Sequence, residues 1–328
     1  MKRRSFARKI LIAGGSGYIG SVLTPLLLER EYEVDVVDLL WFGNNLPANV
    51  KVIQKGVLEL EEDDLRGYDQ VIFLAGLSND AMSEYSPVQA FVENASAPAY
   101  LAYLAKLSGV KRFIYGGTSS VYGFTPNKLC DEICPTSCNL PYSISKLQGE
   151  TGCLHLQDNG FSVICLRLGT VSGFSPRMRF DLIVNTMFKD ALSKQVITVN
   201  NPAIQRPILA IQDAVAAFLK AVEASQEISG VFNISSGNYT VSQVADYVKF
   251  GLKNQLNINV KIKVKHIQDL RNYKISIDKA MSILKFMPRY KVNDIVQDLT
   301  EHVNSFKYLE NDKYYNIRIF KQLNQVPL

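Results

Sequence analysis

The sequence predicts an α/β protein built on a doubly wound parallel sheet, with a smaller C-terminal lobe that is partly interleaved with it. Three observations lead to this prediction. Short runs of β-branched residues alternate with longer helical patterns through the first half of the chain. One run, Gln70–Ala75 (QVIFLA), is almost entirely apolar, which is typical of a strand buried on both faces of a sheet. A glycine-rich turn separates the first predicted strand from the first predicted helix.

Each element of the first half follows from this alternation. Strands are predicted where a short β-branched or aromatic run is bounded by turn residues, at Lys9–Ala13, Glu33–Asp38, Val50–Gln54, Gln70–Ala75, Arg112–Tyr115 and Phe161–Leu168. Helices are predicted between them, at Tyr18–Arg30, at Ser86–Leu107 and over the segment that carries Tyr142.

The pattern loosens after Gly173. We predict a helix at Ser175–Asp190, short strands at Pro207–Ala210 and Val231–Ile234 that return to the sheet, and a helix at Thr240–Leu252 that begins with a capping box from Thr240 to Gln243. The predicted domains are therefore 1–172, with return segments near 205–234, and a lobe made of 173–204 and 235–328. Ligands of such folds bind at the carboxyl ends of the strands, so we expect the lobe to close over that edge.

The composition is that of a folded protein of ordinary size. The chain has 328 residues, of which 47% are hydrophobic, which is ample for a large core. Part of the net charge of +5 lies in Met1–Lys9 (MKRRSFARK). No alternation of basic and aromatic residues follows this tail, so we expect no nucleic-acid partner. No apolar run approaches the ~18 residues of a membrane span, and we expect a cytoplasmic protein without a membrane partner.

The cysteines do not predict a metal site. Cys130, Cys134 and Cys138 are regularly spaced, but zinc sites usually combine Cys-x-x-Cys pairs with a second pair or with histidines. The chain has five cysteines and three histidines without such a pattern. We expect structural or incidental thiols and no metal.

The glycine turn Gly14–Gly20 predicts a dinucleotide site. Gly14, Gly17 and Gly20 are spaced three apart between a strand and a helix, so that the backbone can approach a diphosphate at the helix N-terminus. Asp38 ends the second strand, 18 residues after Gly20, where a carboxylate accepts hydrogen bonds from the adenosine ribose and repels a 2′-phosphate. The expected cofactor is NAD, in a Rossmann-type domain.

Tyr142 and Lys146 are the predicted catalytic pair. They are four residues apart, and on a helix this spacing places both on one face. A neighbouring ammonium favours the phenolate, so we expect Lys146 to lower the pKa of Tyr142. Such a tyrosine is a general acid or base for the interconversion of an alcohol and a ketone.

These motifs together resemble the extended short-chain dehydrogenase/reductase family, in particular its nucleotide-sugar epimerases and dehydratases. The resemblance covers almost the whole chain. It rests on the glycine turn, Asp38, Leu74-Ala75-Gly76, Asn94, Thr118 through Gly123, Pro141 through Lys146, Arg167 through Gly173, Arg206-Pro207 before Asp213, and Arg271.

The resemblance implies a role for each matching residue. Thr118 matches the hydroxyl that binds the reacting sugar oxygen, with Ser119 as a weaker substitute, and Lys146 would also hold the nicotinamide ribose. The cofactor would contact Gly14, Gly17, Tyr18, Ile19, Gly20, Asp38, Leu74, Ala75, Gly76, Tyr142 and Lys146. The substrate would contact Ser78, Thr118, Ser119, Thr170, Arg177, Arg179, Arg206 and Arg271, the last two as a clamp on its diphosphate.

Some positions depart from the family pattern. Val57 stands where the family often has an aspartate that meets the adenine, and Thr170 where an asparagine is common. Members that eliminate water carry an Asp-Glu pair directly after the catalytic threonine, and this chain has Ser119-Ser120. We expect the loop Phe174–Phe180, with Arg177 and Arg179, to face the sugar.

The resemblance implies an NAD-dependent nucleotide-sugar 4-epimerase, which oxidises C4 of the sugar to a ketone and reduces it again from the opposite face. A 4-dehydrogenase or 4-ketoreductase with net redox change would use the same motifs. A non-catalytic dinucleotide-binding sensor is the alternative from another class, but it would keep the glycine turn and lose the Tyr142–Lys146 pair. Family resemblance also implies a homodimer through the helices of Ser86–Leu107 and Tyr142–Gln157.

Overall fold

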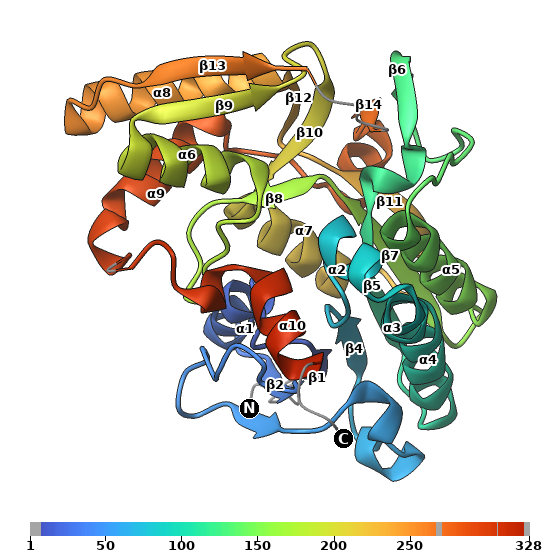
Figure 1. The fold of residues 1–328 in the computed structure, drawn as a ribbon. Coiled ribbons are helices and arrows are strands. Elements are labelled where there is room, and N and C mark those ends of the chain that lie inside the picture. Colours follow the sequence, from blue (N-terminus) through green and yellow to red (C-terminus); the bar gives the residue numbers. More distant parts are fainter. Residues whose placement is uncertain (1–7, 267–270, 307, 325–328) are drawn as a thin grey trace, which may run out of the picture.

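The computed structural model describes residues 8–266, 271–306 and 308–324 (Figure 1). Its centre is a seven-stranded parallel sheet with the order β11-β7-β5-β4-β1-β2-β3. The strands are β1 (Lys9–Ala13), β2 (Glu33–Val37), β3 (Lys51–Ile53), β4 (Gln70–Phe73), β5 (Arg112–Thr118), β7 (Ser162–Leu168) and β11 (Gly230–Ile234). The strand order reverses between β1 and β4, which makes this point the expected binding crevice. The predicted fold class is confirmed.

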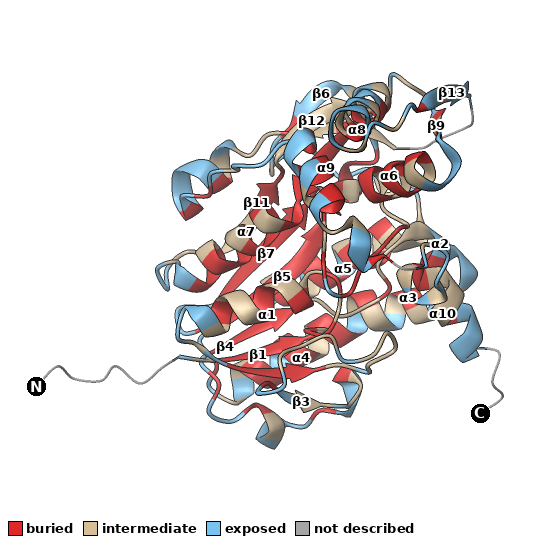
Figure 2. Cartoon of the chain, turned by 90° about the vertical axis from the view of Figure 1, so that its left-hand side faces the viewer, coloured by how far each residue is buried: buried red, intermediate tan, exposed pale blue. Residues whose placement is uncertain are grey.

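Both faces of this sheet are covered, and the strands are buried on each side (Figure 2). Alternate residues of β1 point to different cores: Ile10 and Ile12 belong to one, and Leu11 and Ala13 to the other. The first core contains residues of α1 (Gly20–Glu29) and α7 (Ile211–Glu223), and the second contains residues of α4 (Ala97–Leu107) and α5 (Pro141–His155). This double burial explains why the strands read as continuous apolar runs.

The predicted long helix at Ser86–Leu107 is helical throughout but is not uniform. It consists of α3 (Pro87–Phe91), one π-helical turn at Val92–Ser96, and α4. A wide turn of this kind is rare in helices and occurs often at functional sites. Here the turn contains Asn94, which is fully buried.

The lobe is formed by the second half of the chain and one strand, β6 (Phe124–Cys130), from the first. Its strands pair as β8 (Thr170–Ser172), β10 (Gln205–Ala210) and β12 (Gly237–Thr240), as β9 (Val196–Asn200) with β13 (Lys261–Lys265), and as β6 with β14 (Asn272–Ile275). Its helices are α6 (Ile183–Lys194), α8 (Val241–Leu256), with the predicted Thr240 capping box, and α9 (Val292–Glu301). Of the two predicted return strands, β11 joins the large sheet, but β10 forms the smaller sheet.

The helix predicted at Ser175–Asp190 begins later than expected, at Ile183. The preceding residues form a loop because polar contacts to other elements satisfy its backbone and side chains. The Ser175 hydroxyl donates to the Tyr18 carbonyl (2.8 Å), and the amide of Phe174 donates to Asp298 (2.7 Å). The amide of Phe180 donates to the Tyr314 carbonyl. These are tertiary contacts that local periodicity does not reveal.

The end of the described chain returns to the first domain. The helix α10 (Asn316–Asn324) contacts α2 (Asp80–Tyr85), and Phe320 packs with Leu77 and Met82. In Figure 1, α10 lies among the N-terminal elements, whereas α8, β9 and β13 lie at the opposite end of the molecule. The sequence assigned residues 235–328 to the lobe, whereas α10 contacts elements of the first domain. Over the described ranges, no helix is both long and apolar enough to cross a membrane.

Candidate active site

A cavity of about 580 Å³ lies at the carboxyl ends of the parallel strands and reaches into the lobe. It brings together nearly all of the site residues predicted from the sequence, although they come from both halves of the chain. Lining residues that were predicted are Gly14, Gly17, Tyr18, Ile19, Gly20, Asp38, Leu74, Ala75, Gly76, Ser78, Thr118, Tyr142, Lys146, Thr170, Arg177, Arg179, Arg206 and Arg271. Ser119 does not line it.

The glycine turn brings bare backbone to the cavity wall. Gly14 has φ of +82°, and a Cβ there would lie 2.5 Å from the amide nitrogen of Ala75, at the end of β4. A Cβ on Gly17 would meet only the Gly14 carbonyl, at 3.1 Å, so the space beyond it is open. The turn therefore presents a helix N-terminus without side chains, which is the form that a dinucleotide diphosphate requires.

Asp38 closes the same end of the cavity. Its carboxylate accepts hydrogen bonds from the amides of Ser16 (2.9 Å) and Leu40 (2.8 Å), and burial raises the pKa of Asp38. The Ser16 hydroxyl in turn donates to the Gly43 carbonyl (3.0 Å) and so ties the glycine turn to the segment 39–46. A carboxylate fixed beside the glycine turn fits the adenosine ribose of NAD.

Thr118 and Tyr142 meet at the centre of the cavity. Thr118 is the last residue of β5, and Tyr142 lies in the first turn of α5, which begins at Pro141. The two side chains share a hydrogen bond, and Tyr142 is half-buried. Lys146 lies one turn further along α5, where its ammonium donates to the Gly116 carbonyl (2.6 Å) and lies 4.3 Å from the centre of the Tyr115 ring.

The expected effect of Lys146 on Tyr142 is not observed. Burial and the charge of Asp80 raise the pKa of Tyr142 to about 12, against the smaller lowering effects of Thr118 and Arg179. The ammonium of Lys146 does not offset this rise, and it is bound to the Gly116 carbonyl. Burial also lowers the pKa of Lys146 itself, to about 8. The sequence-based expectation of a low tyrosine pKa is therefore wrong for the protein without bound ligands.

The two serines after Thr118 occupy different environments. The Ser119 hydroxyl donates to the Leu168 carbonyl (2.9 Å) and is buried behind the cavity wall. Ser120 lines the cavity, and its hydroxyl lies 2.9 Å from that of Thr118. The sequence favoured Ser119 as the neighbour of Thr118, whereas the 3₁₀ turn at Ser119–Tyr122 brings Ser120 to the site instead.

Asn94 was a marker of the family resemblance without an assigned role. Its side-chain amide donates to the Leu77 carbonyl (3.0 Å) and to the hydroxyl of Ser145 (3.2 Å). Ser145 is next to Lys146, so Asn94 links the segment after β4 to the catalytic helix. The π-helical turn at Val92–Ser96 directs this side chain inward.

The opposite end of the cavity carries the predicted arginine clamp. Arg206, on β10, donates to the backbone carbonyl of Arg271, and its guanidinium lies 6.0 Å from the centre of the Tyr273 ring. Arg271 forms an ion pair with Asp80. Residues from β9, Thr198 and Asn200, line the same end and were not predicted, because nothing in their local sequence distinguishes them.

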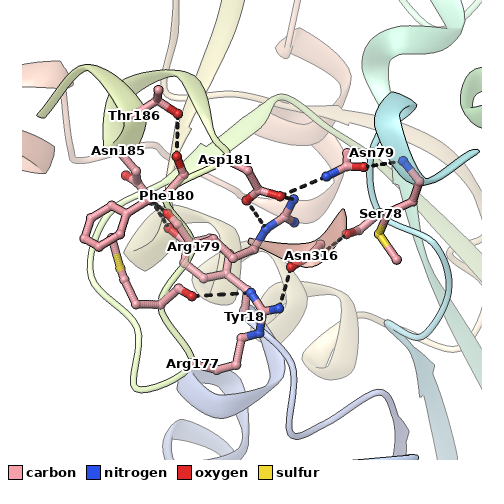
Figure 3. A network of polar contacts seen from close by, with 12 residues as sticks. Tyr18, Ser78, Asn79, Arg177, Arg179, Phe180, Asp181, Asn185, Thr186 and Asn316 are labelled. Atoms are coloured by element: carbon pink, nitrogen blue, oxygen red, sulfur yellow. Dashed lines mark hydrogen bonds and ion pairs between the residues drawn. The ribbon is translucent and has the colours of Figure 1, made fainter. Parts of the chain in front are cut away.

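Arg177 and Arg179 lie on the same loop but have different partners (Figure 3). Arg179 forms two hydrogen bonds to Asp181 (2.8 and 3.0 Å), and its charge acts on Tyr142. Arg177 instead lies against Phe42 and donates to Asn316 of α10. The sequence expected both arginines to face the sugar; Arg179 is the one whose charge lowers the pKa of Tyr142.

Within the described ranges, no group of three or more histidine, cysteine, aspartate or glutamate side chains could hold a metal ion. All five cysteines are unpaired. Cys153 and Cys165 belong to the core, and Cys130 and Cys134 belong to a small cluster with Tyr122 and Tyr273.

Known proteins resemble this chain in sequence. A sequence model of the NAD dependent epimerase/dehydratase family matches residues 10–235. The chain is 28% identical over 305 residues to UDP-glucuronic acid decarboxylase 5 of Arabidopsis thaliana, covering 87% of this chain and 86% of the relative. It is 29% identical over 190 residues to UDP-glucose 4-epimerase 2 of the same plant, covering 52% and 54%.

A solved structure shows the same fold. UDP-glucuronic acid 4-epimerase from Bacillus cereus, in complex with UDP-glucuronic acid and NAD, superposes with a TM-score of 0.79 at 23% identity, over 91% of this chain and 99% of that one. The family match spans the glycine turn, Asp38, Thr118, Tyr142 and Lys146. The chain therefore belongs to the NAD dependent epimerase/dehydratase family, and its cofactor is NAD.

Proposed function

We propose that this protein is a nucleotide-sugar 4-epimerase that oxidises C4 of an NDP-sugar and reduces it again. The observation that carries the proposal is the set of groups that line one cavity. The glycine turn and Asp38 follow β1 and β2, Thr118 ends β5 beside Tyr142, and the arginine clamp (Arg206 and Arg271) includes a residue of β10 in the lobe; all of them line the same cavity. This set matches a dinucleotide and a nucleotide sugar that meet at the tyrosine.

In the proposed reaction, Tyr142 moves a proton and Thr118 orients it. The phenol oxygen of Tyr142 takes the proton from the C4 hydroxyl, and the hydrogen bond with Thr118 fixes the direction of that transfer. Bound NAD supplies the hydride acceptor and donor, together with a positive charge near the site. After the 4-keto sugar has rotated to present its opposite face, Tyr142 returns its proton to the oxygen at C4.

Removal of the C4 hydroxyl proton by Tyr142 needs a nearby cation that favours the phenolate. With a pKa of about 12, Tyr142 is almost entirely protonated at neutral pH, and the ammonium of Lys146 does not offset this in the ligand-free protein. Lys146 lies one helical turn from Tyr142, and its ammonium is held by a neutral carbonyl and an aromatic ring, not by a carboxylate. We therefore assign Lys146 the roles of holding the nicotinamide ribose and of favouring the phenolate.

The substrate end supports a nucleotide diphosphate. Guanidinium groups pair with phosphates through two parallel hydrogen bonds, and Arg206 and Arg271 lie together at the end of the cavity remote from the glycine turn. The relatives named above act on UDP-sugars. We propose a uridine nucleotide as the first substrate class to test.

A second candidate is oxidative decarboxylation of a nucleotide uronic acid, because a decarboxylase is among the relatives that align over most of the chain. Oxidation at C4 gives a β-keto acid, which releases its C5 carboxyl group as CO₂ and is then reduced at C4. This route needs the same Tyr142, and the sugar loses one carbon.

The experiment is incubation of the purified protein with UDP-glucose, UDP-N-acetylglucosamine and UDP-glucuronic acid, each analysed by NMR spectroscopy and mass spectrometry. Inversion at C4 with unchanged mass supports the epimerase. Loss of CO₂ supports the decarboxylase, and stoichiometric reduction of added NAD supports a net dehydrogenase. Absence of any change with all three sugars, in protein that binds NAD, would contradict the proposal for uridine sugars.

A homodimer in the cytoplasm completes the proposal. The helices α3 and α4 expose apolar side chains, namely Val88 (76% exposed), Tyr103 (50%) and Leu107 (51%). A second copy that packed these helices against its own would bury them. Sedimentation of the purified protein measures this state directly.

A further inference from the structure

Arg177 is a buried cation in the wall of the cavity. Arg177 is only 4% exposed, and its guanidinium carbon lies 3.6 Å from the centre of the Phe42 ring. Burial and the neighbouring charge of Arg179 lower the pKa of Arg177 to about 9, so it still carries its charge at neutral pH. Removing a charge from water is costly unless a partner compensates for it.

The partners of Arg177 do not compensate for that charge. Its hydrogen bonds go to two neutral acceptors, the Met178 carbonyl (3.4 Å) and the side-chain carbonyl of Asn316. Its Nε atom is buried and lacks a hydrogen-bond partner in the described part of the chain. No carboxylate within the described ranges reaches ion-pair distance, because Asp181 is bound on both oxygens by Arg179. The guanidinium is thus prepared for an anion that is not part of the protein.

The position of Arg177 identifies which end of the cavity that anion occupies. The loop that carries Arg177 contacts the glycine turn, because the Ser175 hydroxyl donates to the Tyr18 carbonyl (2.8 Å), and the carboxylate of Asp38 acts on the Arg177 charge. Phe42 belongs to the segment 39–46 that Ser16 ties to the glycine turn. The arginine clamp, Arg206 and Arg271, lies instead where β10 and the start of β14 in the lobe reach the cavity. The strongest anion expected beside the N-terminus of α1 is the diphosphate of the dinucleotide.

We infer that Arg177 binds the diphosphate of NAD from the side opposite the glycine turn, and that α10 holds it there. This inference rests on the proposed arrangement of cofactor and sugar nucleotide in the cavity. It assigns Arg177 to the cofactor and leaves Arg179, which interacts with Tyr142, to the sugar.

The contacts of α10 support the second half of the inference (Figure 3). Asn316, the first residue of α10, accepts from Arg177 and donates to the hydroxyl of Ser78, so it links the loop after β8 to the segment after β4. Phe320 packs on Trp41 (ring centres 5.8 Å apart), next to Phe42 in the segment 39–46. The helix therefore fastens three separate segments around the dinucleotide end of the cavity, and Asn316 is a positioning residue for Arg177.

The test compares Arg177→Met with Arg206→Gln as the matched control, in protein freed of bound nucleotide. NAD and UDP are titrated separately by calorimetry. Loss of charged hydrogen bonds should weaken NAD binding about tenfold to a hundredfold in Arg177→Met and leave UDP binding unchanged. Arg206→Gln should give the reverse pattern. Weakened UDP binding with normal NAD binding in Arg177→Met would assign the arginine to the substrate diphosphate and overturn the inference.

Thermal unfolding provides a readout that a structural arginine would not give. Methionine removes an uncompensated buried charge, so unliganded Arg177→Met should unfold at the same temperature as the wild type or higher, and should gain less on addition of NAD. A variant that is unfolded or clearly less stable without NAD would show that Arg177 holds the loop itself, and the inference would fail.

Asn316→Ala tests the positioning role, with an expected loss of NAD affinity smaller than that of Arg177→Met and absent in the Arg177→Met background. Additive losses would contradict a role through Arg177. If the wild type bound no NAD, the proposed function itself would fail. If the wild type binds NAD and Arg177→Met binds it equally tightly, this inference fails and the proposed function stands.

Discussion

Replacement of Tyr142 by phenylalanine should stop catalysis without disturbing the fold. The substitution removes one hydroxyl, whose hydrogen-bond partner Thr118 keeps a second bond to Ser120 (2.9 Å), so no buried polar group loses all its partners. The loss is therefore chemical. Positioned acid–base catalysis is worth roughly 10²–10⁴-fold. At about 1.36 kcal/mol for each factor of ten, this is about 2.7–5.4 kcal/mol of transition-state stabilisation.

The rate of C4 oxidation should depend on pH through the ionisation of Tyr142. Because the pKa of Tyr142 is raised to about 12, the phenolate is the minor form at neutral pH, and its population grows about tenfold for each pH unit. The rate of C4 oxidation in a single turnover should therefore rise with pH in the wild type. In Tyr142→Phe the residual rate should be small and independent of pH over the same range.

The assay is single-turnover reduction of bound NAD, followed by its near-ultraviolet absorbance after addition of a nucleotide sugar. Tyr122→Phe is the matched control, because Tyr122 is a buried tyrosine outside the cavity lining whose hydroxyl binds Arg167 (2.8 Å) and Asn233 (2.8 Å). It should lose stability, roughly 1–3 kcal/mol, and keep its rate for each folded molecule. Retention of more than about a tenth of the activity by Tyr142→Phe would show that another group carries the proton.

Three further predictions follow from the same cavity. The enzyme should bind NAD more tightly than NADP, because the carboxylate of Asp38 repels a ribose 2′-phosphate, and Asp38→Ser should reduce this preference in competitive titrations. Tighter binding of NADP by the wild type would refute the role of Asp38. Arg206→Ala should weaken nucleotide-sugar binding about tenfold to a hundredfold while NAD binding stays constant, as measured by calorimetry. An unchanged sugar-nucleotide affinity would assign Arg206 a purely structural role. The sugar product should retain its C6 oxygen, because Ser119 and Ser120 are neutral hydroxyls that cannot act as strong bases near neutral pH. Mass spectrometry that showed the loss of one water would contradict both the epimerase and the dehydrogenase.

The elements that the sequence predicted well are those whose signal is local. The strand β1 was predicted with its exact bounds, and the capping box at Thr240 is present. The helix predicted at Ser175–Asp190 was placed too early, because Ser175 and Phe174 bind distant groups that no periodicity reports. The tertiary environment in each such case outweighed local preference.

The same division applies to the site. Spacing alone identified the glycine turn, Asp38 and the Tyr142–Lys146 pair, because a turn, a strand end and a helix face each impose a pattern on neighbouring residues. Spacing also suggested that Lys146 lowers the pKa of Tyr142, whereas the pKa is raised, since burial dominates and the ammonium is bound to Gly116. A pKa depends on how deeply the group is buried and on which groups surround it in the folded protein, and neither can be read from the sequence.

The sequence by itself determined the fold class, the family and the cofactor, because short-range patterns of glycine, apolar and catalytic residues specify them. Only the tertiary structure separated Arg177 from Arg179, which are two residues apart in the chain. Asp181 compensates one guanidinium, whereas Phe42 and Asn316, from segments 135 and 139 positions away, desolvate and hold the other. Contacts between segments so distant in sequence decide the charge environment of a side chain, and no local pattern encodes them.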